Sequence, residues 1–141
     1  MSSYAALLLR LTLGTMFIAH GALKVFVFTL PGTVAFFESV GLPGSLTYLV
    51  VAAEFLGGAL LLAGLATRWV ALGLLPILVG ALAVHSGNTW VFSAPNGGWE
   101  YPAFLAVATM VQSLLGSGAW ALDAVVASRS PALRPILSGS V

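Results

Sequence analysis

The sequence predicts an all-α integral membrane protein, a four-transmembrane-helix bundle with a short interfacial helix after the first span. First, 60% of the 141 residues are hydrophobic and only 6% are charged, whereas ~25% of an ordinary soluble domain is charged. Second, the mean hydropathy of the chain is +1.06. Third, the chain contains apolar stretches that approach the ~20 residues a helix needs to cross a bilayer, with room for about four of them. The lipid bilayer is therefore an expected partner.

The composition also excludes several classes of function. The net charge is +1 and there is no basic patch, so nucleic acid is not an expected partner. The chain contains no cysteine, which excludes thiol redox chemistry, disulfides and thiolate metal ligands within it. The segment before Leu7 has no positive charge and no small-residue cleavage site follows, so we expect no signal peptide.

The first predicted span, residues 4–28, carries three basic side chains, Arg10, His20 and Lys24. Charge at membrane depth is costly, so such residues are usually buried against partners and are usually functional. On a helix that turns ~100° per residue, the polar groups share one stripe, with His20 at its edge. The residues of this stripe are Arg10, Phe17, Gly21 and Lys24. A stripe of this kind is typical of a helix that faces a protein interior or a cavity.

The connector after the first span contains signals for a short helix. Thr33 is predicted to cap this helix, which reaches Val40, and Gly41 is predicted to end it. Phe36 and Phe37 indicate that the helix lies on the membrane surface. The alternative is a loop with two apolar side chains.

The second predicted span, residues 45–65, has a single charged residue, Glu54. Gly57 and Gly58 lie on the same side of this helix as Glu54. Small residues on that side would allow another helix to approach closely.

Two further spans complete the predicted bundle, at residues 69–86 and 99–115. His85 lies at the far end of the third span, and Glu100 lies at the start of the fourth. We therefore expect each of the four spans to bring a titratable side chain to the same half of the bundle.

The distribution of arginine predicts the orientation. Arg68, Arg129 and Arg134 fall on one side of the membrane, and the two connectors on the other side contain neither Lys nor Arg. By the positive-inside rule, both termini are cytoplasmic. Residues 1–120 would form the transmembrane domain and residues 121–141 a cytoplasmic tail. The tryptophans that fall at predicted membrane boundaries are Trp69, Trp90, Trp99 and Trp120.

The helical rise allows the depth of each polar group to be compared. His20 is expected ~12 Å and Glu54 ~13 Å from the outer ends of their spans, and Lys24 ~6 Å. A carboxylate and an ammonium group keep their charges in an apolar interior only when they are paired. We therefore predict an ion pair between Lys24 and Glu54 with His20 lining the same cavity, which equips the site to move protons.

These observations predict a polar site in the outer half of the bundle. The predicted catalytic residues are His20, Lys24 and Glu54. The predicted substrate-binding residues are Phe17, Gly21, Gly57, Gly58, His85 and Glu100. No metal is expected, because no Glu-x-x-His pair occurs and the candidate ligands lie at different depths. A bis-histidine haem is not expected either, because its two ligands, His20 and His85, would lie at different depths.

Each polar residue also has a structural interpretation. Lys24 could extend its charged end to the outer headgroups, and Glu54 could be only an ion-pair partner within the bundle. His85 and Glu100 could be ordinary residues of the membrane boundary. Arg10 lies in the inner half, apart from the others, and is expected to anchor that side or to make a helix contact.

The residues resemble those of the DoxX family. Five segments carry the resemblance in order, between residues 7 and 123: RLTLGTMFIAHGALKVF, GTVAFFESVGLPG, AEFLGGALLLAGLATRWVALGL, NGGWEYP and LLGSGAWALD. The family's motif positions fall here on Arg10, His20, Gly21, Lys24, Glu54, Gly57, Gly58 and Glu100. The resemblance implies a four-helix membrane protein of bacterial or archaeal type, and therefore a location in the plasma (inner) membrane of a prokaryote. Its relatives include the quinone-coupled subunit of a thiosulfate-oxidising enzyme and small proteins regarded as membrane oxidoreductases.

Three functions are compatible with these features. The first is a redox subunit that binds a quinone or a small organic substrate, with electrons from a partner protein or directly from the substrate. The second is a non-enzymatic anchoring or accessory subunit of a larger membrane complex. The third, a small carrier for a proton or solute, is disfavoured because no inverted repeat is evident. In the first two cases another membrane or redox subunit is an expected partner, and an oligomer is compatible with both.

Overall fold

The structure is a computed structural model that describes residues 1–133 and 137, and within them it is all-α with no strand. The helices are α1 (Ser2–Ala22), α2 (Leu30–Ser39), α3 (Leu46–Ala63), α4 (Thr67–His85), α5 (Glu100–Leu115) and α6 (Leu122–Arg129). A π-helical segment, Leu23–Val27, continues α1, and a 3-10 turn, Pro131–Leu133, follows α6. The all-α prediction is confirmed. Arg134, which was used to predict the orientation, lies outside the described residues.

Three segments within the described residues are long and apolar enough to cross a membrane: Ser2–Val27, Leu46–Ala63 and Thr67–His85. The fourth predicted span corresponds to α5, which has 16 residues and is therefore ~24 Å long. That length is shorter than the ~30 Å hydrocarbon core of a typical bilayer. The protein is a multi-pass membrane protein in contact with lipid.

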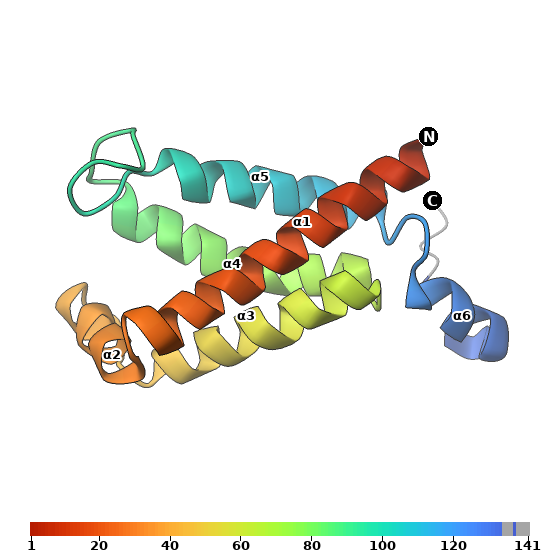
Figure 1. Ribbon diagram of the computed structural model, residues 1–141, viewed down its shortest axis with the longest axis horizontal. Coiled ribbons are helices and arrows are strands. Elements are labelled where there is room, and N and C mark those ends of the chain that lie inside the picture. Colours follow the sequence, from red (N-terminus) through yellow and green to blue (C-terminus); the bar gives the residue numbers. More distant parts are fainter. Residues whose placement is uncertain (134–136, 138–141) are drawn as a thin grey trace.

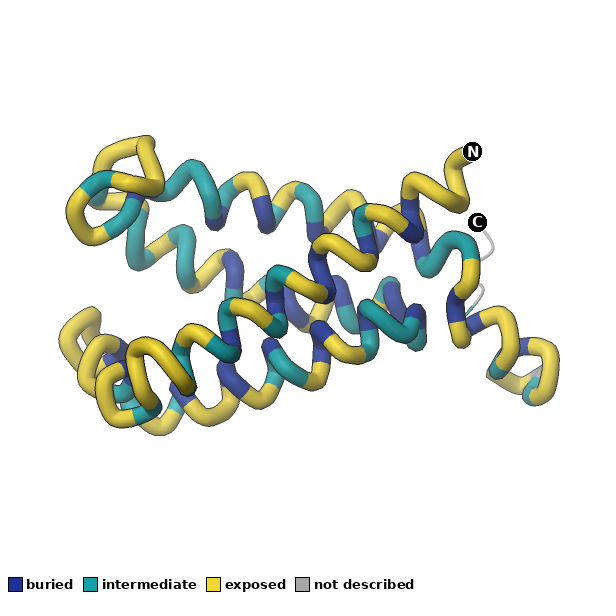
Figure 2. Tube along the Cα trace, in the orientation of Figure 1, coloured by how far each residue is buried: buried dark blue, intermediate teal, exposed yellow. Residues whose placement is uncertain are grey.

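The four long helices run up and down side by side, with α1 beside α3 and α4 beside α5 (Figure 1). The N-terminus, the α3–α4 turn and α6 lie at one end of the bundle, here called the α6 end. The helix α2 and the connector of residues 86–99 lie at the opposite end, here called the α2 end. Buried positions follow the inner sides of the helices, and the outward sides are exposed (Figure 2). The apolar core between the two ends consists of Leu13, Phe17, Leu61, Leu74, Leu78 and Leu105.

Glycines bring α1 and α3 into close contact. A Cβ atom at Gly14 would lie 2.8 Å from the carbonyl oxygen of Gly58, and a Cβ atom at Gly58 would lie 2.8 Å from that of Gly14. Side chains at these positions would push the helices apart, so the two glycines set their separation. The prediction that small residues on the Glu54 side of α3 admit another helix is confirmed.

At the α6 end, Arg10 and Asp123 bind the backbone where α3 ends and α4 begins. The Nη1 atom of Arg10 donates hydrogen bonds to the carbonyl oxygens of Leu61 (2.9 Å) and Leu62 (2.8 Å), which end α3. The carboxylate of Asp123 accepts hydrogen bonds from the backbone N–H groups of Ala66 (2.7 Å) and Thr67 (3.4 Å), which begin α4. A cation at a helix C-terminus and a carboxylate at a helix N-terminus both complement the helix dipole. Arg10 therefore makes a helix contact, one of its two expected roles.

The start of α2 differs from the prediction. Its N-cap is Thr29, whose hydroxyl oxygen accepts a hydrogen bond from the N–H of Gly32 (3.2 Å), so the assignment of the cap to Thr33 is wrong. The helix begins earlier because Pro31 falls in its first turn, where the missing N–H carries no cost. At the other end Gly41 has φ +81°, as expected for a helix-ending glycine.

Candidate functional site

Lys24 and Glu54 form a buried ion pair near the α2 end. The Nζ atom of Lys24 donates to Oε1 (2.7 Å) and Oε2 (2.9 Å) of Glu54. The side chain of Glu54 is 4% exposed and that of Lys24 is 19% exposed. The predicted ion pair is thus confirmed. A carboxylate held by both oxygens in an apolar interior is strongly dependent on its one cationic partner.

Lys24 lies within the π-helical segment Leu23–Val27. A π-helical turn widens the helix and leaves backbone carbonyls without their usual partners, and such turns are frequent at functional sites. Here the hydroxyl of Thr33 donates to the carbonyl oxygens of Lys24 (3.1 Å) and Thr29 (2.9 Å). Thr33 is buried and belongs to α2. It therefore fixes the widened turn against the following helix.

His20 lies on the same side of the bundle and is within electrostatic range of Glu54. Its Nδ1 lies 2.7 Å from the carbonyl oxygen of Met16. A carbonyl oxygen only accepts, so the proton of this bond is on Nδ1. The other ring nitrogen, Nε2, is left for proton exchange or for a hydrogen bond to a ligand.

Tyr101, at the start of α5, packs on His20. The two rings are stacked with centroids 5.6 Å apart and an interplanar angle of 21°. The Tyr101 hydroxyl also lies 3.8 Å from the sulfur of Met16. Sequence reasoning did not select Tyr101 as a site residue. Its position beside Glu100, in a segment that carries the family resemblance, was the available signal, but no sequence pattern shows that it stacks on His20.

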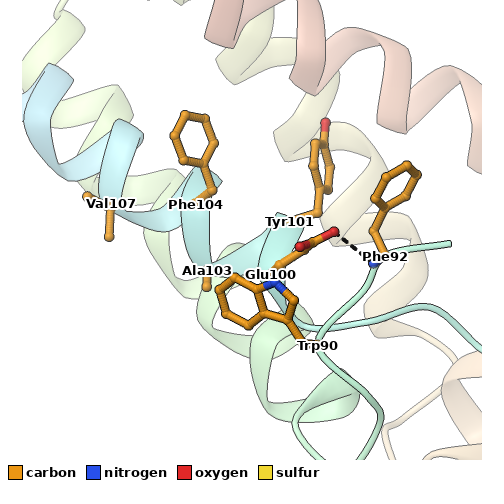
Figure 3. Close-up of a pocket in the computed structure, with 7 residues that line it drawn as sticks. All are labelled: Trp90, Phe92, Glu100, Tyr101, Ala103, Phe104 and Val107. Atoms are coloured by element: carbon orange, nitrogen blue, oxygen red, sulfur yellow. Dashed lines mark hydrogen bonds between the residues drawn. The ribbon is translucent and has the colours of Figure 1, made fainter. Parts of the chain in front are cut away.

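Tyr101 also lines a pocket of about 530 Å³ at the α2 end. The lining residues, from the connector and α5, are Trp90, Phe92, Glu100, Tyr101, Ala103, Phe104 and Val107 (Figure 3). Glu100 Oε1 accepts a hydrogen bond from the backbone N–H of Phe92 (3.0 Å), which joins the start of α5 to the connector. Through the ring of Tyr101, this pocket adjoins the group of His20, Lys24 and Glu54, here called the ion-pair cluster.

The other predicted substrate-binding residues on α1 and α3 lie in helix packing. Phe17 belongs to the apolar core. A Cβ atom at Gly21 would lie 3.2 Å from the ring of Phe55, and one at Gly57 would lie 2.8 Å from the side chain of Leu74. Gly58 faces Gly14, as described above.

The contacts that the structure gives for His85, at the end of α4, are with its own helix and with the connector. Its Nδ1 lies 2.8 Å from the carbonyl oxygen of Ala81, and its ring lies against Gly97 of the connector. Of the six predicted substrate-binding residues, Glu100 is the one that lines the pocket. The functional roles assigned to all of these residues stay predictions.

Comparison with known proteins identifies the family of this chain. The sequence model of the DoxX family matches residues 5–87, which contain the ion pair and His20. The chain is 37% identical over 121 residues to a protein of Bacillus subtilis (strain 168) described as "Putative oxidoreductase CatD", and the similarity covers 85% of each chain. No solved structure matches the chain. With more than half of its length matched by the family model, and a similar protein aligned over most of its length, this chain belongs to the DoxX family.

Proposed function

We propose that this protein is a membrane redox subunit that binds a quinone or a similar small organic ring at the α2 end of the bundle. The observation that carries the proposal is the buried Lys24–Glu54 ion pair beside His20 and Tyr101. Packing alone does not require a histidine with a free Nε2 next to such a pair. The description of the similar Bacillus subtilis protein as an oxidoreductase supports a redox function.

The reduction of a quinone consumes two electrons and two protons. The side chains of the ion-pair cluster are suited to the proton part of this reaction. Lys24 Nζ is a donor for a carbonyl oxygen of the ring, and His20 Nε2 is a donor when the imidazole carries a proton on both nitrogens. Glu54 holds Lys24 in place and can pass protons. Because the chain has no cysteine, electrons would come from a partner protein or from the substrate itself.

The proposal includes four membrane crossings. α5 runs beside α4 (Figure 1), and its polar side chains Thr109, Gln112 and Ser113 are buried inside the bundle rather than turned to lipid. Tilt or local thinning of the bilayer would accommodate its ~24 Å length. With both termini cytoplasmic in the plasma membrane of a prokaryote, the ion-pair cluster would lie in the outer half.

The second candidate function is that of a non-enzymatic accessory subunit. It is favoured by the fact that Lys24 and Glu54 satisfy each other directly, as they would if the pair served only to hold α1 against α3. In this case the charges would specify helix packing and the protein would act by anchoring a partner.

Purification in mild detergent distinguishes the two candidates. Native mass spectrometry and lipid extraction of the same sample would measure bound quinone and bound protein. The redox proposal predicts a quinone that co-purifies with the intact chain and is displaced by added menadione. A stoichiometric protein partner with no quinone, together with no binding of added menadione, would instead establish the accessory function.

A further inference from the structure

Three of the predicted binding positions are taken up by helix packing. A Cβ atom at Gly57 would meet the side chain of Leu74, and one at Gly58 would meet the backbone of α1. Phe17, one turn from His20, is 4% exposed and belongs to the core. A ring that reaches the ion-pair cluster without displacing these groups approaches it from outside this packing.

The pocket on α5 and the connector provides such an approach. It is an open hollow, with Phe92 and Phe104 exposed on the outside of the bundle, and its volume is about 530 Å³. Its walls are mainly aromatic, from Trp90, Phe92, Tyr101 and Phe104. The ring of Tyr101 is shared, since it lines the pocket and also stacks on His20.

The connector holds the pocket in a defined shape. The side-chain amide of Asn88 donates to the carbonyl oxygens of Asn96 (3.0 Å) and Gly97 (2.8 Å), which closes the connector on itself. The rings of Trp90 and Trp99 meet edge to face, with centroids 4.4 Å apart. A wall fixed in this way loses little conformational entropy when a ligand binds.

Glu100 is the charged residue that lines the pocket. Among residues 1–133 and 137, no cation forms an ion pair with it. The aromatic faces around it carry the negative part of the ring quadrupole. The pocket is therefore electrostatically unfavourable to anionic rings, favourable to cationic rings, and without this penalty for neutral ones.

We propose that this aromatic pocket is the binding place of a flat uncharged ring whose carbonyl edge extends past Tyr101 to the ion-pair cluster, and that Glu100 excludes anionic rings from it. The inference rests on the proposed function, because it gives the location and the charge selectivity of the same ligand site. It makes Phe104 and Glu100 determinants of binding and of specificity, respectively.

Two stable probes of the same shape test the location and the selectivity. They are 2-(hydroxymethyl)anthraquinone, which is neutral, and anthraquinone-2-sulfonate, which is an anion. Their dissociation constants would be measured by equilibrium dialysis with the full chain in a non-ionic detergent. Phe104→Ala should weaken binding of the neutral probe about tenfold, because a stacking wall is lost. The matched control is Phe26→Ala, which removes an equally exposed phenylalanine from α1's π-helical continuation, away from the pocket residues.

The charge selectivity is tested with Glu100→Gln, which keeps an oxygen to accept from the N–H of Phe92. Affinity for the sulfonate should rise on the order of tenfold, while that for the neutral probe stays within about twofold. Glu38→Gln on α2 makes the same change in total charge and should leave both affinities unaltered. An unchanged ratio of the two affinities in Glu100→Gln would overturn the role of Glu100.

Failure of this inference can be distinguished from failure of the proposed function. Tight binding of the neutral probe that is equal in wild type, Phe104→Ala and Phe26→Ala would overturn the pocket as the site and leave the quinone-linked function standing. Absence of binding of menadione and of the neutral probe to the wild-type chain would overturn both.

Discussion

At the scale of residues, the Lys24–Glu54 pair is the interaction whose loss has the clearest expected cost. Both Glu54 oxygens accept from Lys24 Nζ, and the carboxylate is almost fully buried. Glu54→Ala leaves an unpaired lysine in the bundle, which should destabilise the fold by about 3–5 kcal/mol. The melting temperature in detergent should fall, whereas Glu38→Ala, at an exposed carboxylate of α2, should change it little.

The double variant Lys24→Met with Glu54→Leu tests whether the stability lost in Glu54→Ala comes from the unpaired charge of Lys24. Replacing both charges by apolar side chains of similar size removes the unpaired charge, so much of the stability lost in Glu54→Ala should return. A melting temperature of Glu54→Ala equal to that of Glu38→Ala would show that the pair does not hold the two helices together.

Residue by residue, the sequence could predict the ion pair but not its aromatic neighbour. Lys24 and Glu54 are charges at similar depth in apolar stretches, and the cost of burying each one alone requires a partner. Tyr101 has no such requirement, because an aromatic residue at the start of a span also fits the membrane boundary. Its stacking on His20 depends on how α1 and α5 pack, which no local pattern encodes.

At the scale of helices, the contact between α1 and α3 depends on glycine. Gly58→Ala would place a Cβ atom 2.8 Å from the carbonyl oxygen of Gly14, so the helices must separate or tilt. We expect a lower melting temperature and a weaker Lys24–Glu54 contact. Gly73→Ala is the matched control, since a Cβ atom on this α4 glycine meets nothing within 4 Å. In that variant stability should be unchanged or raised by up to about 1 kcal/mol, the difference in helix propensity.

These two variants can be compared in a single thermal melt of the detergent-solubilised proteins. Equal melting temperatures for Gly58→Ala and Gly73→Ala would contradict the close approach of α1 to α3. Gly57 and Gly58 also show a limit of sequence reasoning. Helical spacing could predict that they lie on the Glu54 side of α3. It could not predict whether they line a cavity or admit another helix, because both uses favour small residues.

At the scale of the whole molecule, the number of membrane crossings determines which segments lie on the same side of the membrane. If α5 crosses the membrane, the connector of residues 86–99 and α6 lie on opposite sides. Because the chain has no cysteine, Ser93→Cys and Ser128→Cys each give a single exposed thiol. An impermeant thiol reagent applied to intact cells should label the cysteine at position 93, and should label that at position 128 only after lysis.

Two other labelling patterns would change the account. The reverse pattern would invert the orientation and place both termini outside. Labelling of both positions from the same side would show that α5 does not cross, in keeping with its 16 residues. The sequence predicted the apolar stretches well, including the short α5, expected at 99–115 and observed at Glu100–Leu115. The widened turn at Leu23–Val27 could not be predicted, because it depends on packing and on Thr33.

The most direct test of the central claim is the binding of menadione to His20→Ala and Glu54→Gln. Menadione adds to thiols, but this chain has none. The dissociation constant would be measured by equilibrium dialysis below the melting temperature of each variant, with circular dichroism to show that the helices are retained. Loss of the hydrogen-bonding Nε2 of His20, or of the carboxylate that positions Lys24, should weaken binding by a factor of about ten or more in each variant. Glu38→Gln should bind as the wild type does. Tight menadione binding that is unchanged in both His20→Ala and Glu54→Gln would contradict the assignment of the ion-pair cluster as the site.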